Sequence, residues 1–329
     1  MERNVQTMRR LWARLCALAL SLCLILGGCA PSQPGYETIP PSPSVWIPTE
    51  EETLPPGFAA DLVVDLELPE EEPLPGPAAA AISYDITNAR VLYSQSPYER
   101  LYPASVTKLF TVYTALRNGD ITEKVTVGRE AVMPSDSSIC GVVPGDVISL
   151  EDLLYGALFP SGNDACAAIA VHISGSVAAF ARLMNEEAAA IGATGSHFVN
   201  PHGLHDREHY TTAYDIYLVL RALAADDRFL QMFAAPQHTA LYTSGGKQKS
   251  VTWSNTCRYL SGERPTPGDG ELRVIAAKTG TTTPAGYCLA TLAEDTDGTR
   301  YVTVILKAES RGLLYQDTDM MLRRALESR

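Results

Sequence analysis

The chain has 329 residues, enough for one large domain or two small ones, and 46% of them are hydrophobic, enough to build a substantial core. The formal net charge is −12, but ten acidic residues and no Lys or Arg fall in residues 30–75, so the remainder is close to neutral. This charge balance argues against a nucleic-acid partner, because phosphate binding needs clustered Lys and Arg.

The N-terminus has the features of an export signal. Four arginines in the first 14 residues precede an apolar run of 12 residues at 15–26, which is too short to span a bilayer comfortably as a helix. The run ends in Leu26-Gly27-Gly28-Cys29, which resembles a bacterial lipobox, a pattern whose cysteine is lipidated and becomes the mature N-terminus. We expect residues 1–29 to be a lipoprotein signal peptide that anchors the exported protein through Cys29 to the outer face of the cytoplasmic membrane. An ordinary secretory signal and a membrane-spanning anchor are the alternatives.

A linker is predicted after the signal. Residues 30–77 contain 12 of the 22 prolines, together with glutamate triplets at 50–52 and 70–72. Proline and like charge both keep a chain extended, so residues 30–77 form an acidic, proline-rich linker in this prediction. Globular composition begins at Ala78 and defines residues 78–329 as the folded domain.

Strand and helix patterns then follow one another in chain order. A hairpin is predicted from strands at 78–84 and 91–93, and helices are predicted at 104–116, 150–159, 164–173, 177–191 and 212–224. Strands at 272–278, 286–293 and 301–307 come next, before a last helix at 314–327. Strands at both ends of the domain favour an α+β fold, with one sheet completed by both termini and a mostly helical insert between them.

A candidate nucleophile lies near the start of the 104–116 helix, in Ser105-Val106-Thr107-Lys108. Side chains three positions apart lie on one helix face, about 5–6 Å apart at Cβ. That spacing brings the Lys108 amine within reach of the Ser105 hydroxyl, which becomes a good nucleophile only when a neighbour takes its proton. A lysine can act as this base when burial and nearby positive charge keep it neutral part of the time.

Two further elements carry suitable chemistry. Ser161-Gly162-Asn163 follows the 150–159 helix, where the Ser161 hydroxyl can pass a proton to a leaving amine and Asn163 can hold Lys108 or the substrate backbone. Taken alone, this tripeptide is more typical of a turn before a capped helix.

The other element, Lys278-Thr279-Gly280, ends an apolar run and offers a cation and a hydroxyl to a carboxylate. Gly280 allows a ligand to approach the backbone closely, and the amides of Thr281 and Ser105 are candidates for binding an oxyanion.

Together, the motifs at 105, 161 and 278 resemble those of the D-alanyl-D-alanine carboxypeptidases, the low-molecular-weight penicillin-binding proteins of peptidase family S11. The resemblance runs from Ala78 to the C-terminus. It extends to Phe198-Val199-Asn200-Pro201-His202-Gly203-Leu204 and to His209-Tyr210-Thr211-Thr212-Ala213-Tyr214-Asp215.

The resemblance implies a β-lactamase/D,D-peptidase-like fold, in which an antiparallel sheet is flanked by helices beside a mostly helical subdomain. It implies Ser105, Lys108, Ser161 and Asn163 as catalytic residues. It implies Lys278, Thr279, Gly280 and Thr281 as the substrate-binding strand. The expected reaction acylates Ser105 with a peptidoglycan stem peptide ending in D-Ala-D-Ala, releases D-Ala and hydrolyses the acyl-enzyme. β-Lactams are the expected covalent inhibitors, and no cofactor is implied.

Three other functions share parts of this pattern. A serine β-lactamase shares the first and third motifs, but its typical Glu-x-x-Leu-Asn pentapeptide is absent from the sequence. A D,D-endopeptidase uses the same catalytic set on crosslinked peptides and is not separated by sequence. A β-lactam or wall-fragment sensor is the non-enzymatic alternative.

Other residues of the chain also have metal-binding or substrate-binding chemistry. His202, His205 and His209 lie close together, but they belong to the family-like loop and no zinc pattern accompanies them, so no metal site is predicted. Cys257 stands where many relatives have Asn. Arg258, next to it, has the chemistry to bind the terminal carboxylate, but its offset does not match a family arginine, so it is not predicted as a core site residue. The pairing of the four cysteines after Cys29 stays open between free thiols and disulfides.

Overall fold

The computed structural model describes residues 73–328. The predicted signal peptide, its lipidated Cys29 and most of the 30–77 linker therefore lie outside the described residues. Leu74 is buried against the last helix, and the Gly76 amide donates to the carboxylate of Asp317 at 2.7 Å. Residues 73–77, the only part of the predicted linker that the structure describes, thus pack on the domain. Within residues 73–328, no single helix is long and apolar enough to cross a membrane, and one bent pair, Asn163–Ser174 with Val177–Ala190, meets these criteria jointly.

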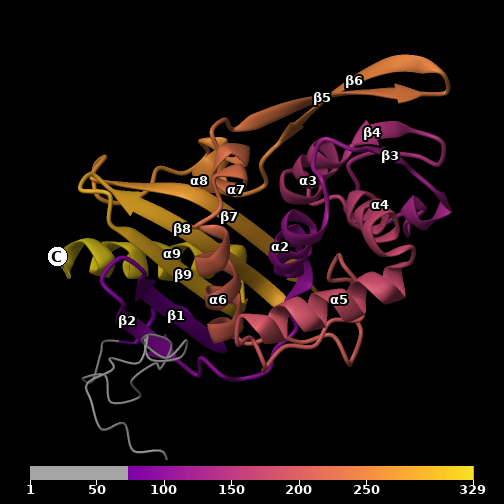
Figure 1. The fold of residues 1–329 in the computed structure, drawn as a ribbon. Helices are drawn as coiled ribbons and strands as arrows, with labels where there is room; N and C mark the ends of the chain where they lie inside the picture. The colour runs from indigo at the N-terminus through magenta and orange to yellow at the C-terminus, as the bar shows by residue number, and fades with distance from the viewer. Residues whose placement is uncertain (1–72, 329) are drawn as a thin grey trace, which may run out of the picture. The chain divides into compact units, whose positions relative to one another are not determined.

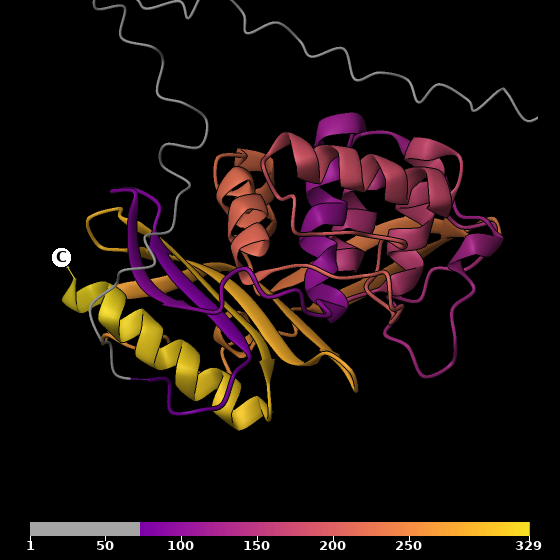
Figure 2. The same ribbon diagram turned by 90° about the horizontal axis from the view of Figure 1, so that it is seen from below.

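A five-stranded antiparallel sheet forms one half of the domain (Figure 1). Its strand order is β2-β1-β9-β8-β7, so the first hairpin pairs directly with the last strand, as predicted. The strands are β1 (Ala80–Asp85), β2 (Arg90–Gln95), β7 (Leu272–Thr282), β8 (Gly286–Asp295) and β9 (Arg300–Ala308). All six residues of β1 are buried, because both faces of the sheet are covered. The C-terminal helix α9 (Arg311–Glu327) lies along one face (Figure 2), and α6 (Ala213–Leu223) packs on the other.

The helices between the two ends of the sheet form most of the other half. They are α2 (Lys108–Asn118), α3 (Leu150–Leu158), α4 (Asn163–Ser174), α5 (Val177–Ala190) and α7 (Asp227–Met232), whereas the short α8 (Arg258–Ser261) packs against β7. The central helix α2 is buried from Lys108 to Leu116, and Phe110 packs on Phe198 with ring centroids 4.6 Å apart. The predicted cap of α3 is present, because the Ser149 hydroxyl accepts a hydrogen bond from the Asp152 amide.

This half of the domain also contains a second sheet, which was not predicted. The four strands pair in the order β3-β4-β5-β6, and the long β5–β6 hairpin extends past α3 (Figure 1). They are β3 (Lys124–Thr126), β4 (Val147–Ser149), β5 (Gln237–Ser244) and β6 (Lys247–Ser254). Strands of three residues are too short to show alternation, whereas β5 does alternate, with Ala240 and Tyr242 buried and Leu241 exposed. The insert therefore combines helices with a small antiparallel sheet.

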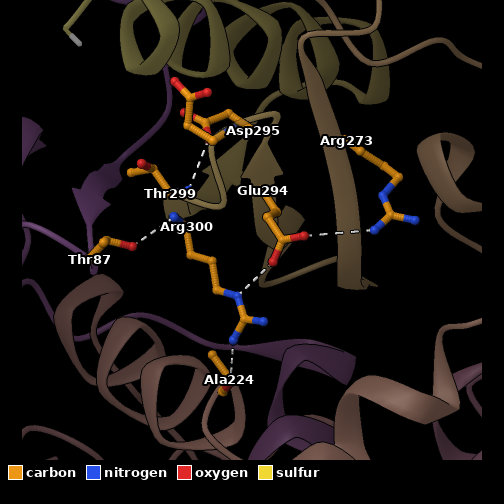
Figure 3. A network of polar contacts seen from close by, with 8 residues as sticks. Thr87, Ala224, Arg273, Glu294, Asp295, Thr299 and Arg300 are labelled. Atoms are coloured by element: carbon orange, nitrogen blue, oxygen red, sulfur yellow. Dashed lines mark hydrogen bonds and ion pairs between the residues drawn. The ribbon is translucent and has the colours of Figure 1, made fainter.

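A polar network ties one end of the five-stranded sheet to α6 (Figure 3). The Arg300 guanidinium contacts the Glu294 carboxylate at 2.8 Å and donates to the Ala224 carbonyl, just past α6, at 2.9 Å. Arg273 flanks the same carboxylate at 3.8 Å. The network holds the helical half against the sheet at the end of β7 away from its Lys278-Thr279-Gly280 segment.

At the other end, β7 touches the turn that carries the candidate nucleophile, η1 (Ala104–Thr107). An ideal Cβ on Gly280 would lie 2.8 Å from the Pro103 carbonyl oxygen and 2.9 Å from the Ser105 nitrogen. No side chain fits in this space, so glycine permits the contact between the sheet and the turn. The backbone of η1 therefore lies against Gly280, and the expected close approach of a ligand to this glycine stays a prediction.

We expect Gly280→Ala to lower the free energy of unfolding by about 2 kcal/mol, because the new methyl group collides with backbone atoms of the turn that carries Ser105. Gly312→Ala is the matched control, since an ideal Cβ on this exposed residue of α9 meets only one atom, at 3.8 Å. That change should be neutral or slightly stabilising. Urea unfolding curves measure both variants, and equal midpoints for the two would contradict the predicted close contact.

Candidate active site

Ser105 lies in the one-turn 3₁₀ helix η1, directly before α2. The single helix predicted over 104–116 is thus two elements, and Ala104 begins the first with a left-handed φ of 46°. A non-glycine residue in this region is uncommon and carries strain of about 1–3 kcal/mol, which concentrates at functional sites. Lys108 opens α2, and its Nζ donates a hydrogen bond to Ser105 Oγ at 2.9 Å. The two side chains meet as the spacing of three residues predicts.

The Lys108 amine is fully buried and has acceptors from three parts of the chain. Besides Ser105, it donates to Asn163 Oδ1 at 2.8 Å and to the His202 carbonyl oxygen at 2.8 Å. Burial lowers the pKa of Lys108 to about 8, and the neighbouring Cys166 and Asp164 partly offset that effect. The neutral amine is therefore accessible near neutral pH.

The second motif occupies the turn between α3 and α4. Ser161 is nearly buried and has a left-handed φ of 62°, the same kind of strained backbone as Ala104. The amine of Lys278, on β7, donates to Ser161 Oγ at 2.9 Å. Burial lowers the pKa of Lys278 well below its usual value, and the charge of Lys108 lowers it further. The two lysines thus contact the same turn, Lys108 at Asn163 and Lys278 at Ser161.

Asp164 anchors this turn and was not predicted as a site residue. Its buried carboxylate accepts hydrogen bonds from the backbone amides of Cys140, Gly141 and Val142 at 2.8, 2.8 and 3.2 Å. The preceding Ser138 carbonyl accepts from the Asn163 amide at 2.9 Å. Asp164 therefore fixes the 138–142 segment beside Asn163. An aspartate in the first turn of a predicted helix was the available signal.

The predicted residues surround one cavity of about 320 Å³. Ser105, Ser161, Thr279, Gly280 and Thr281 line it, while Lys108, Asn163 and Lys278 are buried. The cavity continues past Thr256, whose hydroxyl contacts that of Thr279 at 3.0 Å. Its remaining lining residues include Arg258, Glu263, Arg311 and Tyr315. A second cavity, of about 650 Å³ between α7 and the start of β7, contains none of the predicted site residues.

Burial determines the protonation state of two of the histidines and of the described cysteines. His202 and His209 are largely buried, and burial lowers their pKa values to about 3 and about 4, so both rings are neutral near neutral pH. Four cysteines fall in residues 73–328, and all are buried free thiols: Cys140, Cys166, Cys257 and Cys288. Cys166 lies close enough to both lysines for their charges to lower its pKa, but burial dominates and raises that pKa to about 11.

Several known proteins are similar to this chain in sequence or in fold. The D-alanyl-D-alanine carboxypeptidase family profile matches residues 70–310. D-alanyl-D-alanine carboxypeptidase DacC of Escherichia coli K12 is 34% identical over 278 residues, which is 82% of this chain and 64% of the relative. DacF of Bacillus subtilis 168 is 32% identical over 222 residues, or 66% of this chain and 54% of the relative. This chain thus spans less than two thirds of the length of these relatives.

Solved structures agree with the fold. The D-alanyl-D-alanine carboxypeptidase from Mycobacterium tuberculosis H37Rv superposes with a TM-score of 0.69 and 26% identity, over 80% of this chain and 96% of the other. The Streptomyces K15 DD-transpeptidase gives a TM-score of 0.71 at 23% identity, over 78% and 99% of the two chains, and supports the fold alone. The α+β, penicillin-binding-protein-like architecture predicted from the sequence is confirmed. By its profile match over most of the folded domain, the chain belongs to the D-alanyl-D-alanine carboxypeptidase family of serine peptidases.

Proposed function

We propose that this protein is a serine-type D-Ala-D-Ala carboxypeptidase. It removes the terminal D-alanine from peptidoglycan stem peptides through an acyl-enzyme on Ser105. The observation that carries the proposal is the 2.9 Å contact between the buried amine of Lys108 and the hydroxyl of Ser105 at the edge of the cavity. The family and the names of its members supply the substrate class.

The partners of Lys108 suit the role of general base. A neutral amine has two N–H groups and one lone pair. The Asn163 side-chain oxygen and the His202 carbonyl oxygen can only accept, so they take the two N–H groups. The lone pair then faces the third partner, the Ser105 hydroxyl, and receives its proton as the oxygen attacks the substrate carbonyl.

The second lysine serves the leaving group and the substrate carboxylate. Ser161 lies between the cavity and the Lys278 amine, so its hydroxyl can pass a proton to the departing amine of D-alanine. Lys278 donates a hydrogen bond to the Ser161 hydroxyl and so orients it, while Thr279, on the same strand, offers a hydroxyl to the terminal carboxylate. The backbone amides of Ser105 and Thr281 flank Gly280 and are the proposed oxyanion donors. Water then hydrolyses the acyl-enzyme, and β-lactams acylate the same Ser105.

The N-terminal sequence supports a lipid-anchored, exported enzyme. The short apolar run before Cys29 fits a lipoprotein signal, and residues 30–72 are long enough to hold the domain away from the membrane surface. We propose that acyl chains on Cys29 retain the protein at the outer face of the cytoplasmic membrane, where peptidoglycan stem peptides are accessible.

Ser105→Ala should abolish covalent binding of penicillin. The substitution removes the nucleophile and leaves its neighbours in place, so intact-mass measurement should show an adduct of one penicillin on the wild type and none on the variant. Ser135→Ala, an exposed serine outside the cavity, is the control and should react like the wild type. An equal adduct on Ser105→Ala would remove the proposed nucleophile. Product analysis with a pentapeptide and a crosslinked dimer then separates carboxypeptidase from endopeptidase activity.

The acylation rate should rise with pH. The Lys108 ammonium cannot accept a proton, and its neutral fraction grows about tenfold per pH unit below a pKa of about 8 and levels off above it. Stopped-flow acylation by a chromogenic cephalosporin, followed from about pH 6 to about pH 9.5, measures this dependence. A rate that is constant across this range would rule out Lys108 as the titrating base.

Cys29→Ala should release the protein from the membrane. Without a thiol at this position no acyl chain can be attached, so palmitate labelling should be lost and the protein should move to the soluble fraction. Cys23→Ala, inside the same apolar run, is the matched control and should keep both label and membrane association. Persistent membrane retention of the Cys29 variant without label would instead indicate a spanning anchor.

A further inference from the structure

A buried chain of hydrogen bonds runs from the 197–211 loop to the turn that carries Ser105. The Val199 amide donates to His209 Nδ1 at 3.2 Å, and His209 Nε2 lies 2.8 Å from the hydroxyl of Thr107. That hydroxyl in turn donates to the Ala104 carbonyl oxygen at 2.7 Å. His209 is 2% exposed and Thr107 is fully buried, so water does not compete for these groups. Neither residue belongs to the proposed catalytic set.

The chemistry of the two ends fixes the direction of every bond. A backbone amide can only donate, so His209 Nδ1 must be the acceptor and carry no hydrogen. The neutral ring therefore carries its hydrogen on Nε2, which donates to Thr107 Oγ1. The Ala104 carbonyl can only accept, so it takes the Thr107 hydroxyl hydrogen. All three bonds are satisfied with a single tautomer and a single hydroxyl orientation.

The last acceptor in this chain belongs to the strained residue next to the nucleophile. Ala104 has a φ of 46°, and surrounding contacts must hold such a conformation. Gly203, from the same loop as His209, backs onto this carbonyl so closely that an ideal Cβ there would lie 1.8 Å from the Ala104 oxygen. The 197–211 loop therefore packs directly on the Ala104 carbonyl through Gly203, and it acts on this carbonyl indirectly through the hydrogen bond from His209 to Thr107.

The orientation of this carbonyl has a direct chemical consequence. The Ala104 C=O and the Ser105 N–H belong to one planar trans peptide unit and point in opposite directions. Fixing the oxygen therefore fixes the direction of the Ser105 amide. In the proposed reaction, this amide is one of the two donors to the oxyanion, where small errors of orientation weaken the stabilisation of the transition state.

We propose that His209 is a positioning residue, which acts through Thr107 to orient the Ala104–Ser105 peptide so that the Ser105 amide faces the developing oxyanion. The inference rests on the proposed function of Ser105. His209 touches neither substrate nor Ser105 in this assignment, and it transfers no proton. The low pKa of His209, about 4 because of burial, keeps the ring neutral and preserves the tautomer that the chain of bonds needs.

The test is a set of substitutions whose effects on acylation by penicillin are separated into the binding constant and the acylation rate constant. His209→Phe keeps an aromatic ring but no hydrogen bond, and it should lower the acylation rate constant about tenfold to a hundredfold with binding changed less than about twofold. His209→Gln places an amide N–H near the position of Nε2 and should recover most of the rate. His209→Asn reaches only the position of Nδ1, cannot contact Thr107, and should behave like His209→Phe.

Thr107 gives an independent arm of the same test. Thr107→Val removes the hydroxyl at constant shape and should match His209→Phe, while Thr107→Ser should stay close to the wild type. The double variant His209→Phe/Thr107→Val should be no slower than either single variant, because both break one chain of bonds. His172→Gln, on α4 and outside the loop, is the control and should acylate normally. If His209→Phe does not fold, the Thr107 pair alone decides the outcome.

Several results would overturn the proposal. These are a normal acylation rate in His209→Phe or Thr107→Val, equal rescue by Asn and Gln, and additive losses in the double variant. Long-range ¹H–¹⁵N NMR of the His209 ring gives a readout that does not depend on activity. It should show the hydrogen on Nε2, and the opposite tautomer would exclude the chain of bonds. Should the wild type fail to react with penicillin at all, the proposed function fails, and the NMR result still judges the role of His209.

Discussion

An amine removed from water needs partners for its hydrogens, and the structure gives Lys108 acceptors that come from three separate segments. Ser105 lies three residues before it, Asn163 opens α4, and the His202 carbonyl belongs to a loop almost a hundred residues further along. Without these acceptors, burying the charged form would cost several kcal/mol. The position of α2, the start of α4 and the course of the 197–211 loop are therefore constrained together. The same burial lowers the pKa of Lys108, so the arrangement that fixes these segments also makes the neutral amine available.

Two residues of the site, Ala104 and Ser161, have the same kind of strained backbone conformation. Ala104 precedes Ser105, and Ser161 is itself the serine of the second motif; both adopt left-handed conformations that cost energy in a non-glycine residue. Each is held by contacts from a different part of the chain. Gly203 and Thr107 hold the Ala104 carbonyl, while Lys278 holds the Ser161 hydroxyl and Asp164 anchors the adjoining 138–142 segment. The cavity thus has rigid walls on two sides before any substrate enters.

Local patterns in the sequence were sufficient to predict the strands of the five-stranded sheet and most of the helices. Apolar runs bounded by turn residues marked β7, β8 and β9, and the Ser149 cap marked the start of α3. The contact between Ser105 and Lys108 followed from helical spacing alone. The second sheet was missed for two reasons. β3 and β4 have three residues each, which is too short to show alternation, and the eight-residue strands β5 and β6 are mostly exposed, so few apolar positions mark them as strands. Three contacts of the site could not be predicted from the sequence: those of Asp164, of Gly280 and of the His202 carbonyl. Each joins a residue to backbone, or to a side chain, that is distant in sequence, and no local pattern indicates which distant segment packs there.

The order of strands has a consequence for when this site comes into existence. One of the two inner pairings of the sheet joins β1 to the central strand β9, so that Ser83 faces Thr303 across 220 positions of sequence. Until the last strand arrives, β1 and β2 form an isolated hairpin, which is marginally stable at best in water. Closing so long a loop costs conformational entropy before the stabilising strand contacts form, so this pairing is slow. A nascent or translocating chain that still lacks β9 therefore carries the chemical groups of the site without the completed sheet that positions them.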